Sequence, residues 1–318
     1  MNLPNRLLDA INDELYGHSF SKLSETAKAV SDNYRSMTGV VKGKDEVKAY
    51  VAYRMPGTFS ALHHVFDKIS KRMPDFKPES LLDVGAGPGT SLWASSLVFD
   101  TLRKFSLYEH EYDMILAGKR MLEYLNEEEE YDIHWNRADI TKDTTLEKMD
   151  IVVASYVLNE IDKDKRQELV KKLWECTNHV LVLIEPGSKA GFSIIDECRN
   201  LLINSGGYVI APCTHNNSCP MEKDDWCHFS ARVNRSDFLR YAKGGTLPYE
   251  DEKFSYVCLS KREYICEAEG VVVFPPKPRK GHIILDLCTK DGIVKKTFSK
   301  KDGEVYKKAR DLSLGDDK

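Results

Sequence analysis

A glycine-rich loop that follows a short apolar segment is the feature that most restricts how this chain can fold. Residues 81–90 read LLDVGAGPGT, with glycines at positions 85, 87 and 89. Glycine adopts positive φ and lets a ligand approach the backbone, so the pattern predicts a strand that leads through a binding loop into a helix. Further apolar segments alternate with segments of helical periodicity: 105–108, 133–135, 151–154 and 180–184. This alternation predicts a parallel sheet with right-handed crossovers.

Acidic residues around the loop favour a ligand that carries a positive charge and a ribose. A carboxylate at Asp83 would repel a pyrophosphate, and Thr90 stands where a dinucleotide fingerprint has glycine or alanine. Glu109 ends the second predicted strand, where it can accept the ribose hydroxyls, and Asp139 follows the third, where it can read an adenine edge. The alternative is a simple glycine turn with surface carboxylates. We expect S-adenosylmethionine (SAM) to bind through these residues: Asp83, Gly85, Ala86, Gly87, Gly89, Glu109 and Asp139.

The charge of the chain is nearly balanced overall but uneven along its length. With 46 basic and 50 acidic residues the net charge is −4, so a globally basic nucleic-acid-binding surface is not expected. No apolar stretch approaches the ~20 residues of a membrane-spanning helix, so we expect no membrane partner. Residues 271–310, however, contain 11 Lys and Arg against 4 Asp and Glu. We expect this basic segment to contact RNA phosphates; the alternative is a solvated charged tail.

Three of the eight cysteines lie close together, in a segment with little periodicity. Residues 1–17 lack the apolar core of a signal peptide and contain acidic residues that a mitochondrial transit peptide avoids, which predicts a reducing compartment. Clustered thiols there suggest a metal centre built on Cys213, Cys219 and Cys227, either zinc or iron–sulfur. The candidates for a fourth ligand are Cys288, Cys258, Cys266, His215 and His228. The alternative, cysteines as small buried hydrophobes, is favoured for Cys176 and Cys198.

These patterns divide the chain into three parts. Residues 1–75 are expected to be helical, with one helix broken at Pro56-Gly57. Residues 76–265 are expected to form a Rossmann-like α/β domain with a cysteine-rich metal-binding insertion at 206–250. Residues 266–318 are expected to form a basic C-terminal β extension, in which Asp291-Gly292 marks the turn of a hairpin.

Several longer motifs carry a resemblance to one family. The chain resembles the methyltransferase-like proteins of the mitochondrial ribosomal small subunit and their prokaryotic relatives. The matching segments are YRMPGTFSA (53–61), LLDVGAGPGT (81–90), ASYVLNEI (154–161), LVLIEPGSKAGF (181–192), APCTHNNSCP (211–220), DWCHFSARV (225–233), LPYEDEKFSYV (247–257) and GHIILDLCTKDG (281–292).

The resemblance implies a class I methyltransferase fold and association with the small ribosomal subunit and its rRNA during assembly. It also implies a four-iron–four-sulfur (4Fe-4S) cluster, with zinc as the alternative metal; its ligands would be Cys213, Cys219, Cys227 and Cys288. Mitochondrial members carry a targeting extension that this sequence does not show. We therefore expect a cytoplasmic version, or a mitochondrial one if the source is eukaryotic, and a monomer.

No residue can be assigned to catalysis from the sequence. The segment SYVLNEI at 155–161 lacks the N-P-P-[YF] signature of exocyclic amine methylation. Pro212-Cys213 has the form of the nucleophile that methylates C5 of pyrimidines, but Cys213 fits the metal site better. Asn159 and Glu160 could meet a substrate or simply cap the local structure. Arg54 could reach RNA or cofactor or belong to the surface. Two functions remain: an rRNA methyltransferase, or an assembly factor that uses the SAM fold and the cluster only for binding.

Overall fold

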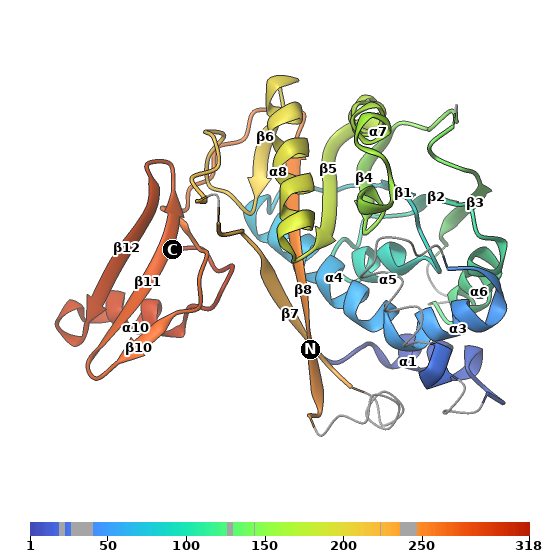
Figure 1. The fold of residues 1–318 in the computed structure, drawn as a ribbon, viewed down its shortest axis with the longest axis horizontal. Coiled ribbons are helices and arrows are strands. Elements are labelled where there is room, and N and C mark those ends of the chain that lie inside the picture. The colour runs from blue at the N-terminus through green and yellow to red at the C-terminus, as the bar shows by residue number, and fades with distance from the viewer. Residues whose placement is uncertain (19–22, 27–40, 126–129, 143, 223, 236–246) are drawn as a thin grey trace. The chain divides into compact units, whose positions relative to one another are not determined.

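The structure is a computed structural model that describes residues 1–18, 23–26, 41–125, 130–142, 144–222, 224–235 and 247–318 (Figure 1). It divides into two compact units, and each unit joins two segments that are separated in the sequence. Unit 1 comprises Met1–Asn178 and Ala231–Glu252, and unit 2 comprises His179–Ser230 and Lys253–Lys318. None of the helices in these described ranges has the length and apolar character needed to cross a bilayer.

The amino-terminal part of unit 1 is helical, as predicted. Its helices are α1 (Asn5–Glu14), α3 (Gly43–Tyr53) and α4 (Met55–Arg72). The break between the last two falls at Arg54 rather than at Pro56-Gly57, because proline is tolerated in the first turn, where its missing N–H has no partner to lose. A predicted helical stretch from about residue 20 to 37 lies largely outside the described residues.

The sheet of unit 1 consists of four parallel strands in the order β3-β2-β1-β4. The strands are β1 (Ser80–Val84), β2 (Lys104–Glu109), β3 (Asp132–Arg137) and β4 (Met149–Ser155). They alternate with α5 (Thr90–Ser96), α6 (Tyr112–Leu122), the short η1 (Leu158–Glu160) and α7 (Lys163–Cys176). The predicted Rossmann-like α/β alternation is therefore present. The carboxyl ends of parallel strands share one edge, which brings the glycine loop and Glu109 to the same edge.

The amino-terminal helices pack onto this sheet unit instead of forming a separate layer. Helix α3 contacts both α4 and α6, and α1 contacts α6. The guanidinium of Arg120 in α6 donates two hydrogen bonds of 2.8 Å to the buried carboxylate of Glu14 in α1. Helix α3 is thereby held near the loop that follows β1.

Unit 2 contains β5 (Thr177–Pro186), α8 (Lys189–Asn204), β6 (Tyr208–Ala211) and most of β8 (Tyr249–Ser260). Strand β8 runs antiparallel to both β5 and β6, and β7 (Phe229–Asn234) also pairs with β8. Strands β6 and β7 were not predicted, because they are only four and six residues long and flank a segment rich in Cys, His and Asn that shows little periodicity.

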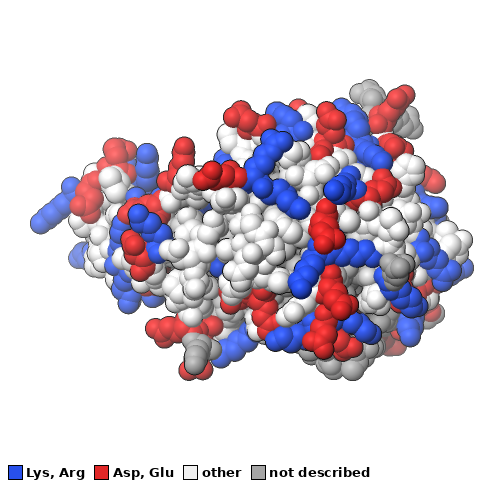
Figure 2. Space-filling view, turned by 90° about the horizontal axis from the view of Figure 1, so that it is seen from above, with Lys and Arg blue, Asp and Glu red and all other residues white. Residues whose placement is uncertain are grey.

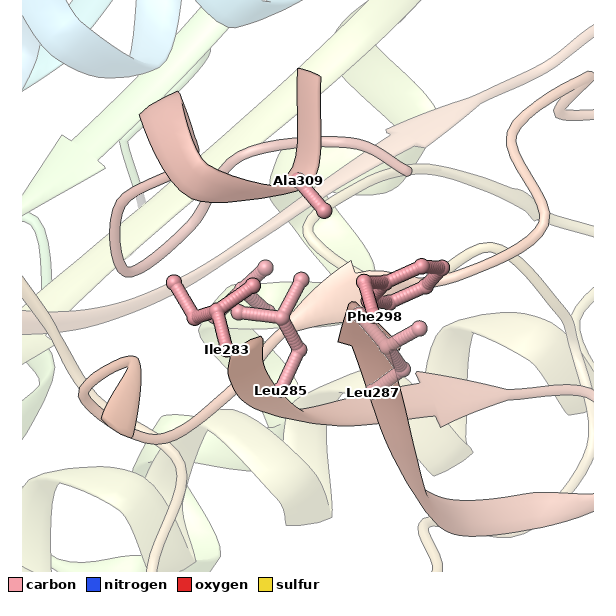
Figure 3. Packing of buried hydrophobic residues seen from close by; sticks show 6 residues of the cluster. Ile283, Leu285, Leu287, Phe298 and Ala309 are labelled. Atoms are coloured by element: carbon pink, nitrogen blue, oxygen red, sulfur yellow. The ribbon is translucent and has the colours of Figure 1, made fainter. Parts of the chain in front are cut away.

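A second, smaller sheet in unit 2 contains the predicted hairpin. Its order is β10-β11-β12 with β9 beside β11, and the strands are β9 (Val271–Val272), β10 (Lys277–Arg279), β11 (His282–Thr289) and β12 (Gly292–Ser299). Thr289 pairs with Gly292, so the turn consists of Lys290 and Asp291. The short η2 (Lys300–Asp302) and α10 (Glu304–Asp311) follow. Side chains of β11, β12 and α10 meet in a small core (Figure 3): Ile283, Leu285, Leu287, Phe298 and Ala309.

Candidate functional site

The glycine loop after β1 has the backbone conformation that its sequence predicts. Gly85, Gly87 and Gly89 all have positive φ, at +76°, +54° and +82°. The amides of Gly85 and Ala86 both donate to the carbonyl of Tyr108, at 2.9 and 3.0 Å, which fixes the loop to the end of β2. A Cβ at Gly85 would lie 2.9 Å from Cγ2 of Val157, so the backbone is closely approached from the segment after β4.

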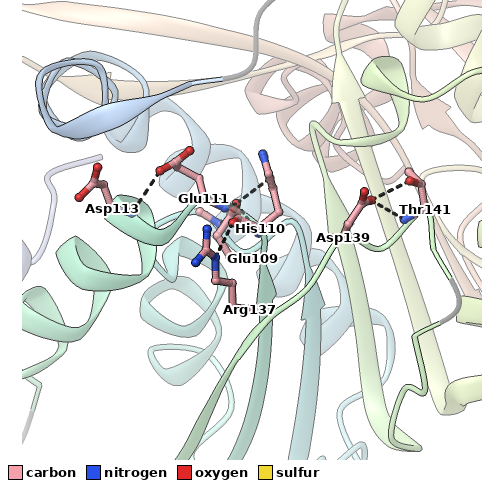
Figure 4. A network of polar contacts seen from close by, with 8 residues as sticks. Glu109, His110, Glu111, Asp113, Arg137, Asp139 and Thr141 are labelled. Atoms are coloured by element: carbon pink, nitrogen blue, oxygen red, sulfur yellow. Dashed lines mark hydrogen bonds and ion pairs between the residues drawn. The ribbon is translucent and has the colours of Figure 1, made fainter.

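Glu109 is anchored to this loop. Its Oε2 accepts a hydrogen bond of 2.9 Å from the Gly87 amide, and its Oε1 accepts from the amides of His110 and Glu111, both at 2.8 Å (Figure 4). Burial alone would raise the pKa of Glu109, but the hydrogen bonds from His110, Glu111 and Gly87 outweigh it and hold the pKa below its usual value. The carboxylate is therefore ionised and rigidly placed beside the loop.

Asp83 carries a buried oxygen that lacks a partner. Its side chain is only 1% exposed, and Oδ2 accepts a hydrogen bond from the Ser91 hydroxyl. Among the described residues nothing donates to Oδ1. Burial, with a smaller contribution from the charge of Glu109, raises the pKa of Asp83 to about 7. A buried carboxylate of this kind suits a cationic ligand, since such a ligand supplies the missing countercharge.

Two further groups that sequence reasoning did not place in the site lie in this electrostatic neighbourhood. Burial and the charge of Glu109 raise the pKa of Glu160, in η1, to about 7. The Tyr50 hydroxyl, on α3, would lie 3.8 Å from a Cβ at Gly87, and burial raises its pKa. Glu160 was considered only as a substrate contact or cap. No sequence motif marks Tyr50, because its position depends on how α3 packs.

Asp139 lies after β3, as predicted, but its carboxylate is engaged in its own turn. Its Oδ1 accepts hydrogen bonds from the Thr141 hydroxyl at 2.7 Å and the Thr141 amide at 3.0 Å, as Figure 4 shows. Those hydrogen bonds, with the nearby Lys142, lower the pKa of Asp139 to about 2. The structure thus joins Glu109 to the glycine loop, while the role of Asp139 at an adenine edge stays a prediction.

The segment after β4 carries a tyrosine with a buried hydroxyl next to an ion pair. Tyr156 has a φ of +59°, which is uncommon for a residue with a side chain. The Arg54 guanidinium lies 5.9 Å from the Tyr156 ring centroid and pairs with Glu252 at 3.3 Å. A Cβ at Gly57 would lie 2.8 Å from Oε2 of Glu252. The motifs YRMPGTFSA and LPYEDEKFSYV therefore meet here, which the sequence alone did not indicate.

In unit 2 the four cysteines predicted as metal ligands line one cavity. The other two cysteine candidates for the fourth ligand do not line it: Cys258 is fully buried in β8, and Cys266 lies in the loop that follows. The remaining walls are largely apolar and include Phe192, Ile195, Phe229, Val271 and Val273. The structure therefore brings together Cys213, Cys219, Cys227 and Cys288.

The thiols of this cavity are strongly perturbed by burial. Burial raises the pKa of Cys219 to about 11 and that of Cys288 to about 12, and it raises that of Cys227 well above the usual value. Each of these thiols also feels the charge of Cys213, so deprotonating them together requires a compensating cation. Within the described ranges, no three His, Cys, Asp or Glu side chains are close enough to hold a single ion.

A buried arginine lines the same cavity. Arg199, on α8, is 3% exposed and donates to the carbonyls of His215 at 3.0 Å and Asn217 at 2.7 Å. In the described part of the chain its Nε has no hydrogen-bond partner, and its charge acts on Asp196, which lines the same cavity. Nε2 of His215 lies 3.7 Å from Sγ of Cys288. A buried cation with an unused donor can stabilise an anionic occupant, and a metal centre bound by four thiolates is one.

Comparison with known proteins gives one family. A model described as "Mitochondrial small ribosomal subunit Rsm22" matches residues 44–318. The human protein "Ribosome assembly protein METTL17, mitochondrial" is 30% identical over 284 residues, which cover 84% of this chain and 61% of that protein. "Rsm22-cox11 tandem protein 2, mitochondrial" from Schizosaccharomyces pombe is 26% identical over 358 residues, covering 93% of this chain and 45% of that protein.

The chain thus spans only 45–61% of the length of these curated relatives. Their names place them in mitochondria, which supports the mitochondrial alternative and gives no support to the expected cytoplasmic location.

Solved structures of SAM-dependent enzymes also match, at low similarity. Magnesium protoporphyrin IX methyltransferase from Synechocystis, with bound SAM, has a TM-score of 0.42 at 12% identity and covers 73% of this chain and 91% of its own. The N-methyltransferase NodS from Bradyrhizobium japonicum, bound to S-adenosyl-L-homocysteine, has a TM-score of 0.42 at 12% identity and covers 75% and 99%. A likeness at this level carries no argument about function.

Proposed function

Because this chain belongs to the family described as mitochondrial small ribosomal subunit Rsm22, we propose that it acts in small-subunit assembly by binding ribosomal RNA, with SAM in the glycine-loop site of unit 1. The observation that carries the SAM assignment is the hydrogen bond between Glu109 and the Gly87 amide, beside the buried and partly unpartnered Asp83. Together they offer a ribose acceptor and a negative countercharge at one loop. The protein acts as a monomer in this proposal.

Calorimetric titration with SAM tests the cofactor assignment. Glu109→Gln removes the ionised acceptor and is expected to weaken SAM binding about 30-fold, corresponding to about 2 kcal/mol. Glu175→Gln, an exposed position on α7, is the matched control and should bind SAM like the unchanged protein. Equal SAM affinity in the two variants would contradict the role of Glu109. Absence of SAM binding by the unchanged protein would contradict the site.

Two uses of bound SAM remain possible, and one observation favours the second. An rRNA methyltransferase needs room for an acceptor at the carboxyl end of β4. That position holds Tyr156, whose hydroxyl is buried, and the Arg54–Glu252 ion pair. These groups occupy the acceptor position and support an assembly factor that binds SAM without transferring its methyl group, whereas the nearby Glu160, an exposed carboxyl in η1, would be the base of a transfer reaction. Mass spectrometry of small-subunit rRNA from deletion and parent cells decides: loss of one methyl mark establishes the enzyme.

We further propose that the thiol-lined cavity of unit 2 holds a four-iron–four-sulfur cluster on Cys213, Cys219, Cys227 and Cys288. The residues fit such a group, because four thiols from two distant segments surround one apolar space and the buried Arg199 supplies a positive charge beside it. Zinc, which four thiolates can also bind, is the alternative metal. When bound, the cluster would link the loop between β6 and β7 to β11.

Anaerobic purification with metal analysis tests this assignment. We expect about four iron atoms per chain, a brown protein, and loss of both in Cys219→Ser. Cys258→Ser, at a cysteine outside the cavity, should keep the iron. A colourless protein with one zinc per chain would make zinc the resident metal.

A further inference from the structure

The C-terminal sheet of unit 2 sorts its charged side chains onto two faces. Side chains alternate between the faces of a strand, and directly opposite residues on neighbouring strands share a face. In the β11–β12 register Ile283 faces Phe298 and Leu285 faces Lys296, and the apolar members of these pairs pack on α10 (Figure 3). The intervening positions must therefore lie on the opposite face, away from α10.

We call this opposite side the outer face and define it by the remaining register pairs. His282 lies opposite Ser299 and Arg279, Ile284 lies opposite Thr297 and Lys277, and Asp286 lies opposite Lys295. Its polar side chains are Lys277, Arg279, His282, Asp286, Lys295, Thr297 and Ser299.

The basic residues of the two faces differ in how far they are neutralised. On the α10 side, Lys296 pairs with Glu269, Lys307 pairs with Glu304 at 2.7 Å, and Arg310 pairs with Asp311 at 2.9 Å. These three charges are compensated, while Lys308 of α10 is exposed and has no ion-pair partner within the described residues.

On the outer face only one carboxylate is present, Asp286, and it is 7% exposed because Lys277 binds it at 2.8 Å. Arg279 and Lys295 are exposed, and neither has an ion-pair partner within the described chain. Lys300 lies at the same end of the sheet, since its amide donates to the Gly281 carbonyl at 3.0 Å. Arg279 and Lys295, with Lys300 nearby, are thus the uncompensated cations that the outer face offers to an anionic partner.

We propose that the outer face binds the phosphate backbone of ribosomal RNA; this deepens the proposed function and rests on it. The cations of the outer face lie on β10 and β12, which flank β11, so they stand about 10 Å or more apart and their long side chains can reach separate phosphates along one strand. The face offers no aromatic side chain at its register positions, so it suits contact with the backbone and not stacking on bases. Over the surface seen in Figure 2, by contrast, basic and acidic side chains are interspersed.

The outer face shares strand β11 with a proposed cluster ligand. Cys288 is two residues from Asp286 and therefore projects to the same side of the sheet, where it lies opposite Ile293 and lines the thiol cavity. A metal centre that fixes Cys288 would hold the strand that carries His282 and Asp286. RNA affinity and cluster occupancy should accordingly change together.

The test compares two double variants that each remove one arginine and one lysine. Arg279→Gln/Lys295→Gln changes the outer face, and Lys307→Gln/Arg310→Gln changes the α10 side by the same charge. Binding to an in-vitro transcript of small-subunit rRNA is measured from about 50 to 200 mM salt. We expect the outer-face variant to lose at least tenfold in affinity and to reduce the salt slope by about 1.4, at roughly 0.7 per single-stranded phosphate contact. The control variant should bind like the unchanged protein.

The possible outcomes separate the two proposals. Equal loss in both variants, or no loss in the outer-face variant, overturns the outer face as the RNA contact while leaving rRNA binding in place. Failure of the unchanged, cluster-containing protein to bind the transcript overturns the proposed function itself. Competition by poly-glutamate as strong as that by RNA would make the face an acidic-protein site. Circular dichroism and iron content of both variants show that each is folded and loaded.

Discussion

At the scale of single residues, both candidate sites are marked by buried charged groups with incomplete partners. Asp83 has a buried oxygen without a donor, and Arg199 has a buried Nε without an acceptor, within the described ranges. Such groups cost folding free energy unless a ligand completes them. Each therefore indicates the sign of its ligand: a cation at the glycine loop and an anion at the thiol cavity.

The pKa values of Asp83 and Glu160 predict how SAM binding depends on pH. Both carboxyls have folded-state pKa values of about 7, above their ordinary values, so they take up protons as the pH falls through 7. Protonation removes the negative charge that attracts the sulfonium and amino groups of SAM. We expect SAM affinity to fall between about pH 8 and pH 6, measured by calorimetry. Glu160→Gln should make that fall shallower; an unchanged profile would contradict the coupling.

The same shifts predict an opposite trend for the stability of the unliganded protein. Between about pH 4 and 7 the folded state binds more protons at these two carboxyls than the unfolded state does. Their contribution to the free energy of unfolding therefore decreases as pH rises through this window. Denaturant titration in that pH range without SAM should show a smaller loss of stability for Glu160→Gln than for the unchanged protein. An equal loss of stability in the variant and the unchanged protein would exclude Glu160 as a source of this pH dependence.

Arg199 is expected to influence the redox potential of the proposed cluster. Its positive charge lies beside Cys219 and Cys288, and it favours the more negative, reduced state. Arg199→Gln should lower the reduction potential, while Arg199→Lys, which keeps the charge, should largely restore it. Spectroelectrochemical titration of both variants gives the answer. An unchanged reduction potential in Arg199→Gln would contradict this influence and would give the arginine only a structural role, through its hydrogen bonds to two carbonyls.

At the scale of elements, two glycine substitutions separate the effect of backbone strain from the effect of a steric contact in the glycine loop. Gly85→Ala places a Cβ 2.9 Å from Val157 at a φ of +76°, whereas Gly206→Ala, after α8, meets nothing within 4 Å at a φ of +85°. Each should cost about 1–3 kcal/mol of stability through backbone strain. Only Gly85→Ala should also weaken SAM binding, because only it shifts the loop. Similar SAM affinity in both variants would place the ligand elsewhere.

Elements with long periodic patterns could be predicted from the sequence, and those that depend on packing could not. The strands of unit 1, helices α5 to α8 and the β11–β12 hairpin follow from apolar periodicity and the glycine and Asp-Gly signals. Strands β6 and β7 are too short for a pattern of alternating apolar residues to be recognised. Of the residues around the two candidate sites, the sequence predicted Glu109 and the four cysteines. It did not predict Tyr50 and Arg199, because their positions depend on how α3 and α8 pack.

At the scale of the whole molecule, the two candidate sites belong to different compact units. The glycine loop and Glu109 lie in unit 1, and all four thiols of the cavity lie in unit 2. Loss of the proposed cluster in Cys219→Ser should therefore leave SAM binding intact while rRNA binding is lost. Hydrogen exchange should report loosening around Cys288 and protection kept in β1. A variant that still binds rRNA normally would contradict this coupling.

The division of the chain also restricts the order in which the protein can be completed during synthesis. Unit 1 needs residues 231–252, including the Glu252 that pairs with Arg54, and these leave the ribosome after residues 179–230 of unit 2. The segment 1–178 must therefore wait, with this ion pair unmade, until about three quarters of the chain has emerged. During that interval Arg54 lacks the carboxylate of Glu252, and it is the period in which a chaperone or early cofactor supply would matter most.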